Sequence, residues 1–464
     1  MPETLMKETL TELTAISPID GRYRSKVEKL EKYFSEAALI HYRIKMEIEY
    51  LTFMSDYPGI NLRKFTEDEK DLLRKIYKTS WDKASAVKEH ESITNHDVKS
   101  VEYFIKDEIT GTSLEDVKEW IHFATTSEDT NNIAYTLMLS DALAKELIPN
   151  LEKLNSKIND FAHEYAQTAI MARTHGQAAS PSTFGKEFKL FSHRISREIA
   201  KLKELKLTAK LNGATGNYNA HLAAFPDLDC FDFTKKFIDQ LNQNQSQKIE
   251  ANLITSQIES HDTIAELFNI IERVNTVLIG FNQDIWRYIS DSWLTQKVNE
   301  KEVGSSTMPH KVNPIDFENS EGNLGLANAL LHFFSSKLQI SRLQRDLSDS
   351  TVMRNIGLAF AYSIIAYKSS LKGLNKLSVN ESVTEKALIE NTQVIAEAIQ
   401  TVLRRENFPV PYEALKALSR GRTLTQNDFI QFIDSLEVND LIKTELKKFT
   451  ALNYIGIASK IANL

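Results

Sequence analysis

The sequence contains little of what crosslinks or bends a polypeptide chain. Its 464 residues include one cysteine, 15 glycines and 10 prolines. The single cysteine, Cys230, excludes an internal disulfide and fits a reducing compartment. Scarce glycine and proline, together with abundant Leu, Ile, Lys, Glu and Ala, favour helix over sheet. We therefore expect an all-α fold in a cytoplasmic protein.

Further absences narrow the class of function. The formal net charge of −7 argues against a protein that coats nucleic acid. No stretch approaches the roughly 20 apolar residues of a membrane helix, and the N-terminus lacks a basic region followed by an apolar run. We expect neither a membrane span nor a signal peptide. The glycine-rich dinucleotide motif, the Walker loop and His-Glu-x-x-His are also missing.

Long apolar periodicity is what the sequence does contain. Between residues 256 and 293 the apolar positions alternate steps of three and four: Ile264, Leu267, Ile271, Val274, Leu278, Phe281, Ile285 and Ile289. A helix of this length would run roughly 50–60 Å. Similar patterns occupy residues 131–161, with a kink expected at Pro149, and residues 184–202, 315–338 and 350–374. Such helices predict an elongated bundle shared between subunits.

The periodicity divides the chain into three expected domains. Residues 1–125 mix short helical patterns with loops; residues 81–95 look irregular and 97–109 helical. Residues 126–375 form the long-helix bundle. Residues 376–464 have shorter helices with breaks at Pro409, Pro411 and Gly421, and form a small helical domain.

Polar residues gather in four places, each expected at a helix end or in a loop. These are residues 94–97, 125–132, 173–177 and 304–319. The last has two prolines and no apolar periodicity, so it reads as a polar loop that closes at Pro314 into a helix. Ordinary structural roles are open as well. Asn95, Asp97, Ser127 and Asp129 could cap helices, and His175 could be an interior histidine.

Three kinds of chemistry can be weighed against these clusters. Acyl transfer lacks a Gly-x-Ser-x-Gly elbow on a strand. Metal catalysis lacks a ligand pattern, the best group being Glu89-His90-Glu91 with His96, so no metal is expected. Proton abstraction beside a carboxylate needs a base, an acid and positive charge where a dianion develops. Lys311 and Asn313 could stabilise the dianion, and a histidine could be the acid.

The motifs identify a family. The loop GSSTMPHKVNP resembles the signature of the fumarase/aspartase superfamily, whose members eliminate fumarate from C–N or C–O bonds. The wider pattern is similar to the adenylosuccinate lyases in their longer bacterial form. It comprises SPIDGRY, TNHDVKSVEYF, FATTSEDTNN, RTHGQAASPSTFGKE, NGATGNYNAH, PIDFENSEGN and RDLSDSTVMRN. One position departs from the family, because Ala178 follows His-Gly-Gln where proline is usual.

The resemblance implies a reaction and the residues that perform it. Adenylosuccinate would be cleaved to AMP and fumarate, and the succinyl-aminoimidazole carboxamide ribotide of purine synthesis would be cleaved likewise, without a cofactor. Ser305 would remove the Cβ proton. His175 would protonate the leaving nitrogen, held by Glu318. His96 and Lys311 complete the expected catalytic set.

The resemblance also implies a substrate-binding set and an assembly. Five residues resemble the family's phosphate-binding set, namely Arg22, Tyr23, Arg345, Ser350 and Arg354. The full substrate-binding set is Arg22, Tyr23, Asn95, His96, Asp97, Thr126, Ser127, Gln257, Ser306, Lys311, Val312, Asn313, Asn319, Arg345, Ser350, Thr351, Val352, Met353 and Arg354. Three subunits of a homotetramer would contribute to each site. A sibling lyase acting on a small dicarboxylate, or a helical scaffold without activity, are the alternatives. The intact Ser305, His175 and Lys311 and the phosphate-type arginines count against them.

Overall fold

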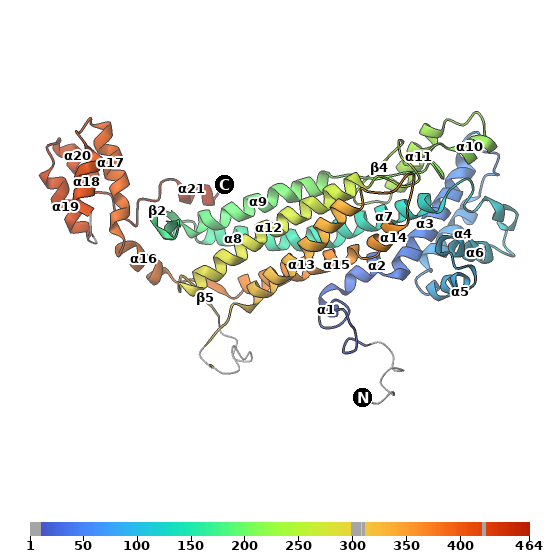
Figure 1. Ribbon diagram of the computed structural model, residues 1–464, viewed down its shortest axis with the longest axis horizontal. Helices are drawn as coiled ribbons and strands as arrows, with labels where there is room; N and C mark the ends of the chain where they lie inside the picture. The colour runs from blue at the N-terminus through green and yellow to red at the C-terminus, as the bar shows by residue number, and fades with distance from the viewer. Residues whose placement is uncertain (1–10, 298–307, 309–310, 420–423) are drawn as a thin grey trace. The chain divides into compact units, whose positions relative to one another are not determined.

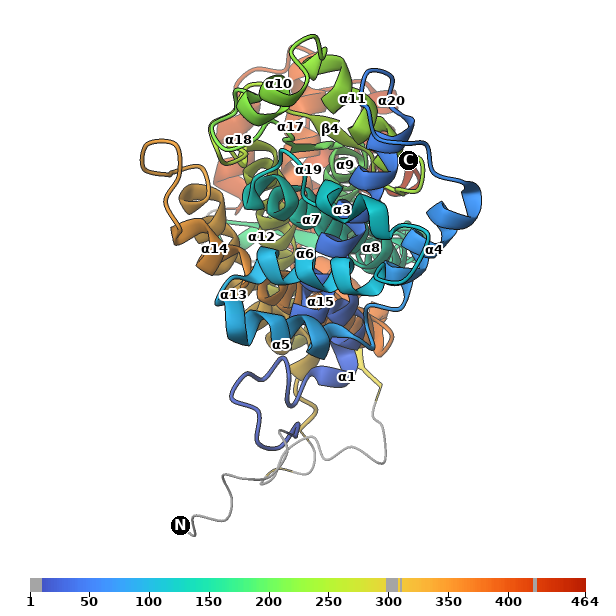
Figure 2. The same cartoon turned by 90° about the vertical axis from the view of Figure 1, so that its right-hand side faces the viewer.

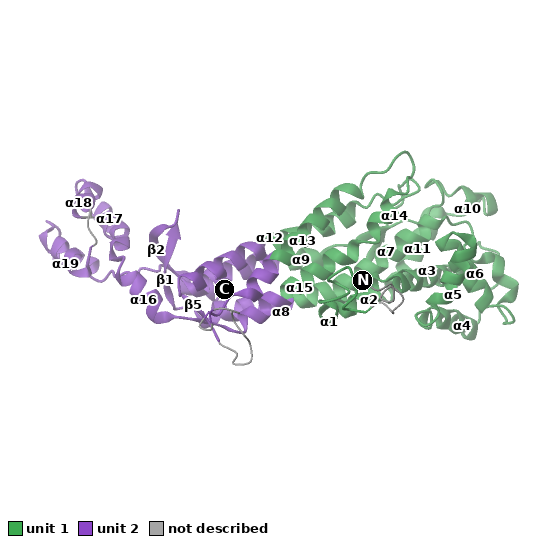
Figure 3. Cartoon of the chain, turned by 60° about the horizontal axis from the view of Figure 1, so that its bottom comes forward, with its two compact units in different colours: residues 1–151, 198–276, 322–367 green, residues 152–197, 277–321, 368–464 purple. Residues whose placement is uncertain are grey.

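The computed structural model describes residues 11–297, 308, 311–419 and 424–464 (Figure 1). Within them, helices dominate and strands occur only as three two-stranded sheets. The chain forms two compact units, each made of three segments (Figure 3). Unit 1 comprises residues 1–151, 198–276 and 322–367, and unit 2 comprises residues 152–197, 277–321 and 368–464. The all-α expectation is confirmed.

Unit 1 is built around α3, a 21-residue helix (Glu36–Asp56) that packs against α4, α6 and α7 (Figure 2). Only short helices are expected here from the sequence, because α3 is buried on nearly every side and shows no amphipathic stripe. Even Arg43, Glu47 and Glu49 are buried on it. The other elements at this end are α1 (Arg24–Val27), η2 (Glu28–Leu30), α2 (Glu31–Phe34), α4 (Glu67–Lys78), α6 (Asp97–Glu108) and η3 (Glu115–Trp120).

One expectation for this region is wrong. Residues 81–95 were expected to be irregular, yet α5 spans Ala84–Thr94. Its sequence, ASAVKEHESIT, buries only Val87, so it lacks the apolar repeat by which a helix is recognised. Packing against α6 holds it in place. The helix expected from residue 97 is confirmed as α6.

The helical stretch expected from residue 131 begins earlier, and its regular α-helix is interrupted just before Pro149, where a kink is predicted. Helix α7 runs Ser127–Ala142, a π-helical turn η4 covers Leu143–Leu147, and α8 runs Ile148–Glu164. Pro149 lies just inside α8, where its missing N–H breaks the regular ladder. A π turn accommodates such a break by shifting the hydrogen-bond register.

Unit 2 has an aromatic core where three helices meet. They are α8, α9 (Phe184–Glu204) and α12 (Asp262–Ser290). The ring centroids of Phe161 and Phe188 lie 5.2 Å apart, and those of Phe188 and Phe281 lie 5.8 Å apart. All three rings are buried. These aromatic contacts pack α8, α9 and α12 against one another in unit 2.

The apolar seam predicted on α12 is confirmed, because every seam residue except Ile289 is buried. The helix is shorter than expected. Its 29 residues correspond to roughly 44 Å at 1.5 Å per residue. The chain before it is not helical, and His261 immediately precedes the helix at a φ of 60°.

Helix α13 (Ile315–Lys337) begins directly after Pro314, as the signature motif predicted. In unit 2, Ser370 Oγ donates to Asn282 Oδ1 at 2.9 Å and lies 2.8 Å from Ser320 Oγ, so buried polar groups tie α12, α13 and α15 together. Gly373 lets Phe317 approach, since a Cβ at this glycine would lie 2.7 Å from the ring. The pattern expected over 350–374 is split into α14 (Ser348–Met353) and α15 (Ile356–Leu374).

The three sheets are small. In unit 2, β1 (Ala169–Thr174) and β2 (Gln177–Thr183) form an antiparallel hairpin, and β5 (Leu294–Gln296) pairs antiparallel with β6 (Leu377–Val379). In unit 1, β3 (Leu207–Ala209) pairs parallel with β4 (Ile249–Ala251), beside α10 (Asn219–Ala224) and α11 (Cys230–Asn242).

Short helices follow α15, as predicted for the C-terminal region. They are α16 (Glu381–Ile389), η5 (Thr392–Ile395), α17 (Ala396–Arg405), α18 (Pro411–Ser419), α19 (Gln426–Ser435), α20 (Asp440–Leu446) and α21 (Ala458–Ala462). Gly421 lies outside the described residues. Among the described helices, none is both long and apolar enough to cross a membrane.

Candidate active site

The N-terminus of α7 organises one group of predicted residues in unit 1. Thr126 is the N-cap and forms a capping box with Asp129, so the capping role weighed for Asp129 is confirmed. Ser127 is the first helical residue. The prediction that Ser127 caps this helix is wrong, because Thr126 occupies the N-cap position. Thr126 and Ser127 are thereby fixed at the positive end of the helix dipole, where an anionic ligand is favoured.

A buried ion pair attaches a second segment to this helix end. Lys210 Nζ lies 3.0 Å from Asp129 Oδ1, and both side chains are inaccessible to solvent. The same carboxylate accepts hydrogen bonds from the backbone N–H groups of Asn212 and Gly213. Buried charges persist only when they are paired and hydrogen-bonded. The start of the NGATGNYNAH motif is therefore held against α7.

Arg345 and Gln257, both predicted to bind substrate, meet at this place. Arg345 Nη1 donates to Gln257 Oε1 at 3.3 Å, and Gln257 Nε2 donates to the carbonyl of Ala214 at 3.0 Å. Arg345 Nη2 lies 3.3 Å from Glu128 Oε2. Glu128 is not among the site residues predicted from the sequence. Its place between Ser127 and Asp129, within the motif FATTSEDTNN, could have pointed to it.

A second group surrounds the start of α6. His96 is its N-cap and accepts from the Lys99 N–H, and Asn95 ends α5 in the left-handed region at a φ of 52°. The capping role proposed for Asn95 or Asp97 thus belongs to His96 at the N-terminus of α6. Burial of Asp97 opposes its ionisation, but Arg43 and Arg354 outweigh burial and lower its pKa.

Arg354, predicted to bind phosphate, is already paired within the chain. Its Nη1 lies 2.7 Å from Glu36 Oε2, and its Nη2 lies 3.2 Å from Asp97 Oδ2. Arg354 also lines a cavity of about 240 Å³ together with Arg24, Glu31 and Ser35. A phosphate that entered here would take over donors that the two carboxylates now occupy.

The remaining predicted residues of unit 1 are more loosely placed. Arg22 is exposed, and Tyr23 is partly buried where the chain enters α1. The predicted run from Ser350 to Met353 lies in α14, with Thr351 exposed and Met353 buried. The structure thus brings Arg345 and Gln257 together at α7, and Arg354 and Asp97 together at α6.

In unit 2, His175 lies in the turn of a β-hairpin, where the sequence predicted a helix end or a loop. Thr174 pairs with Gln177, which leaves His175 and Gly176 as a two-residue turn with φ values of 53° and 74°. Positive φ at both positions is the requirement of a type I′ turn. His175 is exposed. The interior-histidine interpretation is therefore wrong for the single chain, and a strained position of this kind is typical of functional residues.

The signature loop is described only at its end. Ser305 and Ser306 lie outside the described residues. Lys311 is exposed, and its N–H donates to the Met308 carbonyl at 3.0 Å. Gln296 Nε2 donates to the Val312 carbonyl at 3.1 Å. The loop end is thus attached to β5, and Asn313 and Pro314 lead directly into α13.

Glu318 lies in the first turn of α13, and Asn319 follows it. Glu318 is exposed and accepts a hydrogen bond from Trp286 Nε1 at 3.1 Å, while Asn319 Oδ1 accepts from Ser369 at 2.8 Å. Among the described residues of unit 2, no hydrogen bond or ion pair joins Glu318 to His175. The predicted pairing of these two residues stays a prediction, and within one chain it is not formed.

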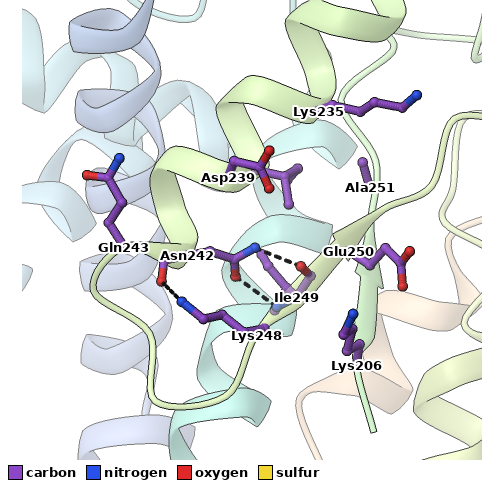
Figure 4. Close-up of a pocket in the computed structure, with 10 residues that line it drawn as sticks. Lys206, Lys235, Asp239, Asn242, Gln243, Lys248, Ile249, Glu250 and Ala251 are labelled. Atoms are coloured by element: carbon purple, nitrogen blue, oxygen red, sulfur yellow. Dashed lines mark hydrogen bonds between the residues drawn. The ribbon is translucent and has the colours of Figure 1, made fainter. Parts of the chain in front are cut away.

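One cavity of unit 1 contains none of the predicted site residues. This cavity, of about 550 Å³, is lined by Lys206, Lys235, Lys248 and residues of α11 and β4 (Figure 4). The Asn242 side chain closes one side of it by hydrogen bonds to the backbone of Ile249. His90, considered as a metal ligand, instead lies 3.0 Å from Asp107.

Comparisons with known proteins identify the family to which the chain is similar. The model of the family described as lyase matches residues 21–328, and that of the adenylosuccinate lyase C-terminal region matches residues 341–455. An adenylosuccinate lyase of Dictyostelium discoideum is 48% identical over 97% of each chain. One of Escherichia coli (strain K12) is 46% identical over 97% of this chain and 98% of its own.

A solved structure extends the likeness to the fold. The fumarate lyase from Mesorhizobium sp. BNC1 has a TM-score of 0.73 at 16% identity, covering 94% of this chain and 96% of its own. At this identity the match shows a shared fold alone. The identity to the curated relatives and the two family models show more, namely that the chain belongs to the adenylosuccinate lyase family.

Proposed function

We propose that the protein is an adenylosuccinate lyase, which eliminates fumarate from adenylosuccinate to give AMP and from the succinyl-aminoimidazole carboxamide ribotide in the same way. The observation that carries the proposal is identity of 46–48% along nearly the whole chain to enzymes of this name. The side chains that the chemistry requires are all present in the sequence. Both substrates share the succinyl group that is eliminated and a phosphate remote from it.

The elimination assigns a separate task to each group. Ser305 removes the proton from Cβ, and the electron pair is held by the adjacent carboxylate, to which Lys311 and Asn313 donate. The C–N bond then breaks, and His175 gives its proton to the leaving nitrogen. Positive charge and N–H donors placed where the dianion develops lower the barrier more than they strengthen substrate binding.

Residues of unit 1 would bind the succinyl carboxylates and the phosphate of the substrate. Thr126 and Ser127 at the N-terminus of α7, with Gln257, suit the succinyl carboxylates, because this helix end presents backbone N–H groups to an anion. Arg22, Arg345 and Arg354, with Tyr23 and Ser350, suit the phosphate, because guanidinium gives paired hydrogen bonds to phosphate oxygens. His96 and the residues beside it lie next to the substrate.

We further propose that the enzyme is a homotetramer whose sites combine residues of different subunits. The face of α13 in unit 1 supports this. It exposes Leu326 and Phe333 at 53% and 49%, one heptad apart. On the same helix, a Cβ added at Gly322 or Gly325 would meet no atom within 4 Å. A second copy of the helix fits such a surface, and the predicted pairing of His175 with Glu318, which the described contacts of one chain do not form, would then form between subunits.

Two further expectations from the sequence stay proposals. The three-domain division at residues 125 and 375 is supported by the change from long to short helices after α15. A cytoplasmic location is supported by the single, free cysteine.

The direct test is an ultraviolet assay with adenylosuccinate, in which AMP and fumarate are also quantified by chromatography. Equimolar AMP and fumarate are expected. Argininosuccinate, aspartate and malate serve as controls for the sibling lyases, and turnover of any of them in preference to adenylosuccinate would contradict the proposal. An absence of turnover with all of them would favour a scaffold without activity.

A further inference from the structure

Glu128 is a buried carboxylate to which the mechanism assigns no task. It lies in the first turn of α7, directly after Ser127, and is 4% exposed. Its Oε2 lies 3.3 Å from Arg345 Nη2. A carboxylate is removed from water to this extent only where a cation or a hydrogen-bond network compensates, or where it takes up a proton. Arg345 is the cation that this contact provides.

The contact orients one edge of the guanidinium. Nη2 faces Glu128, and Nη1 donates to Gln257, which is itself fixed by its hydrogen bond to the Ala214 carbonyl. Arg345 Nε is buried, with no hydrogen-bond partner among the described residues. Because guanidinium has five donors in a rigid plane, fixing two nitrogens fixes the direction of the remaining N–H groups.

Charged groups of both signs surround Glu128. Burial is the largest effect and raises the pKa of Glu128 to about 8. Asp349 and Asp129 add to this rise, while Arg345 and Lys210 oppose it by favouring the ionised form. His261 lies beside Glu128. One carboxylate oxygen of Glu128, one of Asp349 and one ring nitrogen of His261 all lie within 4.8 Å of one another. Burial lowers the pKa of His261, so at neutral pH this ring is uncharged.

We propose that Glu128 is a positioning residue, whose ionised carboxylate holds the Arg345 guanidinium ready to receive the substrate phosphate. The inference rests on the proposed function, which makes Arg345 a substrate ligand. Without the ion pair, Arg345 would have to be ordered by each substrate molecule. Holding a long side chain in its bound orientation before binding removes that ordering cost.

The sign of the pH dependence follows from the same contact. As pH rises through about 8, Glu128 loses its proton and the ion pair with Arg345 becomes complete. KM for adenylosuccinate should fall over this interval. In Glu128→Gln, which keeps the shape but never ionises, KM should stay at the low-pH value throughout. If Glu128 only stabilised the fold, KM would not both change with pH in the wild type and stay constant in Glu128→Gln.

The experiment compares Glu128→Gln with a matched control, Glu49→Gln. Glu49 is also a buried carboxylate of unit 1, 7% exposed and 3.1 Å from an arginine, Arg74, but it has no predicted role. Above pH 8, Glu128→Gln should raise KM by about 3–10-fold, the equivalent of ordering one long side chain. Its kcat should change by no more than about twofold, since Glu128 touches no reacting group. Glu49→Gln should leave KM unchanged.

A double variant tests whether Glu128 acts through Arg345. Arg345→Lys keeps the charge but not the planar fork. If the inference holds, Glu128→Gln adds little to the KM of Arg345→Lys, because the two substitutions remove one interaction. Additive effects would overturn the inference. So would a lower KM in Glu128→Gln, which would mean that Glu128 competes with the phosphate.

A binding measurement separates this inference from the proposed function. AMP affinity, titrated by thermal shift, requires no turnover and should weaken in Glu128→Gln by the same factor as KM. Turnover by the wild type with unchanged AMP affinity in Glu128→Gln would overturn only the role of Glu128. A wild type that neither cleaves adenylosuccinate nor binds AMP would overturn both.

Discussion

Several predicted site residues of unit 1 are paired within the chain, whereas the described ones of unit 2 are mostly exposed. In unit 1, the predicted ligands Arg345, Gln257, Arg354 and Asp97 are tied to one another or to buried carboxylates within the chain. In unit 2, His175, Lys311 and Glu318 are exposed, and the described contacts do not join them. The residues of unit 1 that we propose to bind the substrate are thus positioned by contacts within the single chain. For the residues of unit 2 that we propose for catalysis, the described contacts provide no such arrangement. Substitutions in each unit should therefore have different signatures.

The largest effect is expected in unit 2. His175→Ala should lower kcat by about 10²–10⁴-fold, the usual contribution of a general acid, with a smaller change in KM. The melting temperature should be unchanged, because the side chain is exposed. His193→Ala, another exposed histidine of unit 2, is the control. Mixing His175→Ala with Ser305→Ala should restore some activity if subunits share sites. No recovery after verified subunit exchange would contradict sharing.

In unit 1 the largest effect should be on stability. Lys210→Met leaves Asp129 as a buried charge without its partner, which should lower the free energy of unfolding by about 3–5 kcal/mol. Urea denaturation of the purified protein measures it. Lys88→Met breaks an exposed pair with Glu91 and should cost at most about 1 kcal/mol. Equal losses in the two variants would mean that burial of the Lys210 pair is unimportant.

A third substitution separates binding from chemistry. Arg354→Ala should raise KM by about 10–100-fold, the equivalent of losing a hydrogen bond to a charged group, with a smaller effect on kcat. Arg405→Ala removes an exposed ion pair with Glu445 in unit 2 and should leave KM unchanged. If Arg354→Ala lowered kcat at constant KM, this arginine would belong beside the reacting bond.

The smallest effect concerns acid stability. The folded-state pKa of Asp97 lies below its ordinary value, because Arg43 and Arg354 outweigh burial. Its carboxylate therefore adds stability that is fully present above the unfolded-state pKa, about 3.9, and is lost as pH falls through the lower folded value. Asp97→Asn should flatten the fall in unfolding free energy between about pH 5 and pH 2. Asp227→Asn, at an exposed position, should leave the slope intact.

Helices with one apolar face could be predicted from the sequence. Helices that are buried on all sides, or on almost none, could not. Helix α12 was visible because one stripe is apolar. Helix α3 was missed because nearly all of it is buried, and α5 because almost none of it is. The sequence predicts a helix end or a loop at His175 but not a hairpin turn, since a histidine at positive φ has no signature in the sequence. The site residues came from motif resemblance. Contacts such as Glu128 with Arg345 depend on tertiary structure, and no spacing rule reveals them.

The Asp129–Lys210 pair has a consequence for the order in which the protein folds. An ammonium group cannot enter an apolar interior alone, so the segment after β3 can dock only when α7 already presents its carboxylate. The two partners are far apart in the sequence, and closing the chain between them carries an entropic cost that local helices avoid. We expect this junction to form late. Substitution of Lys210 should then accelerate unfolding while leaving the rate of refolding nearly unchanged.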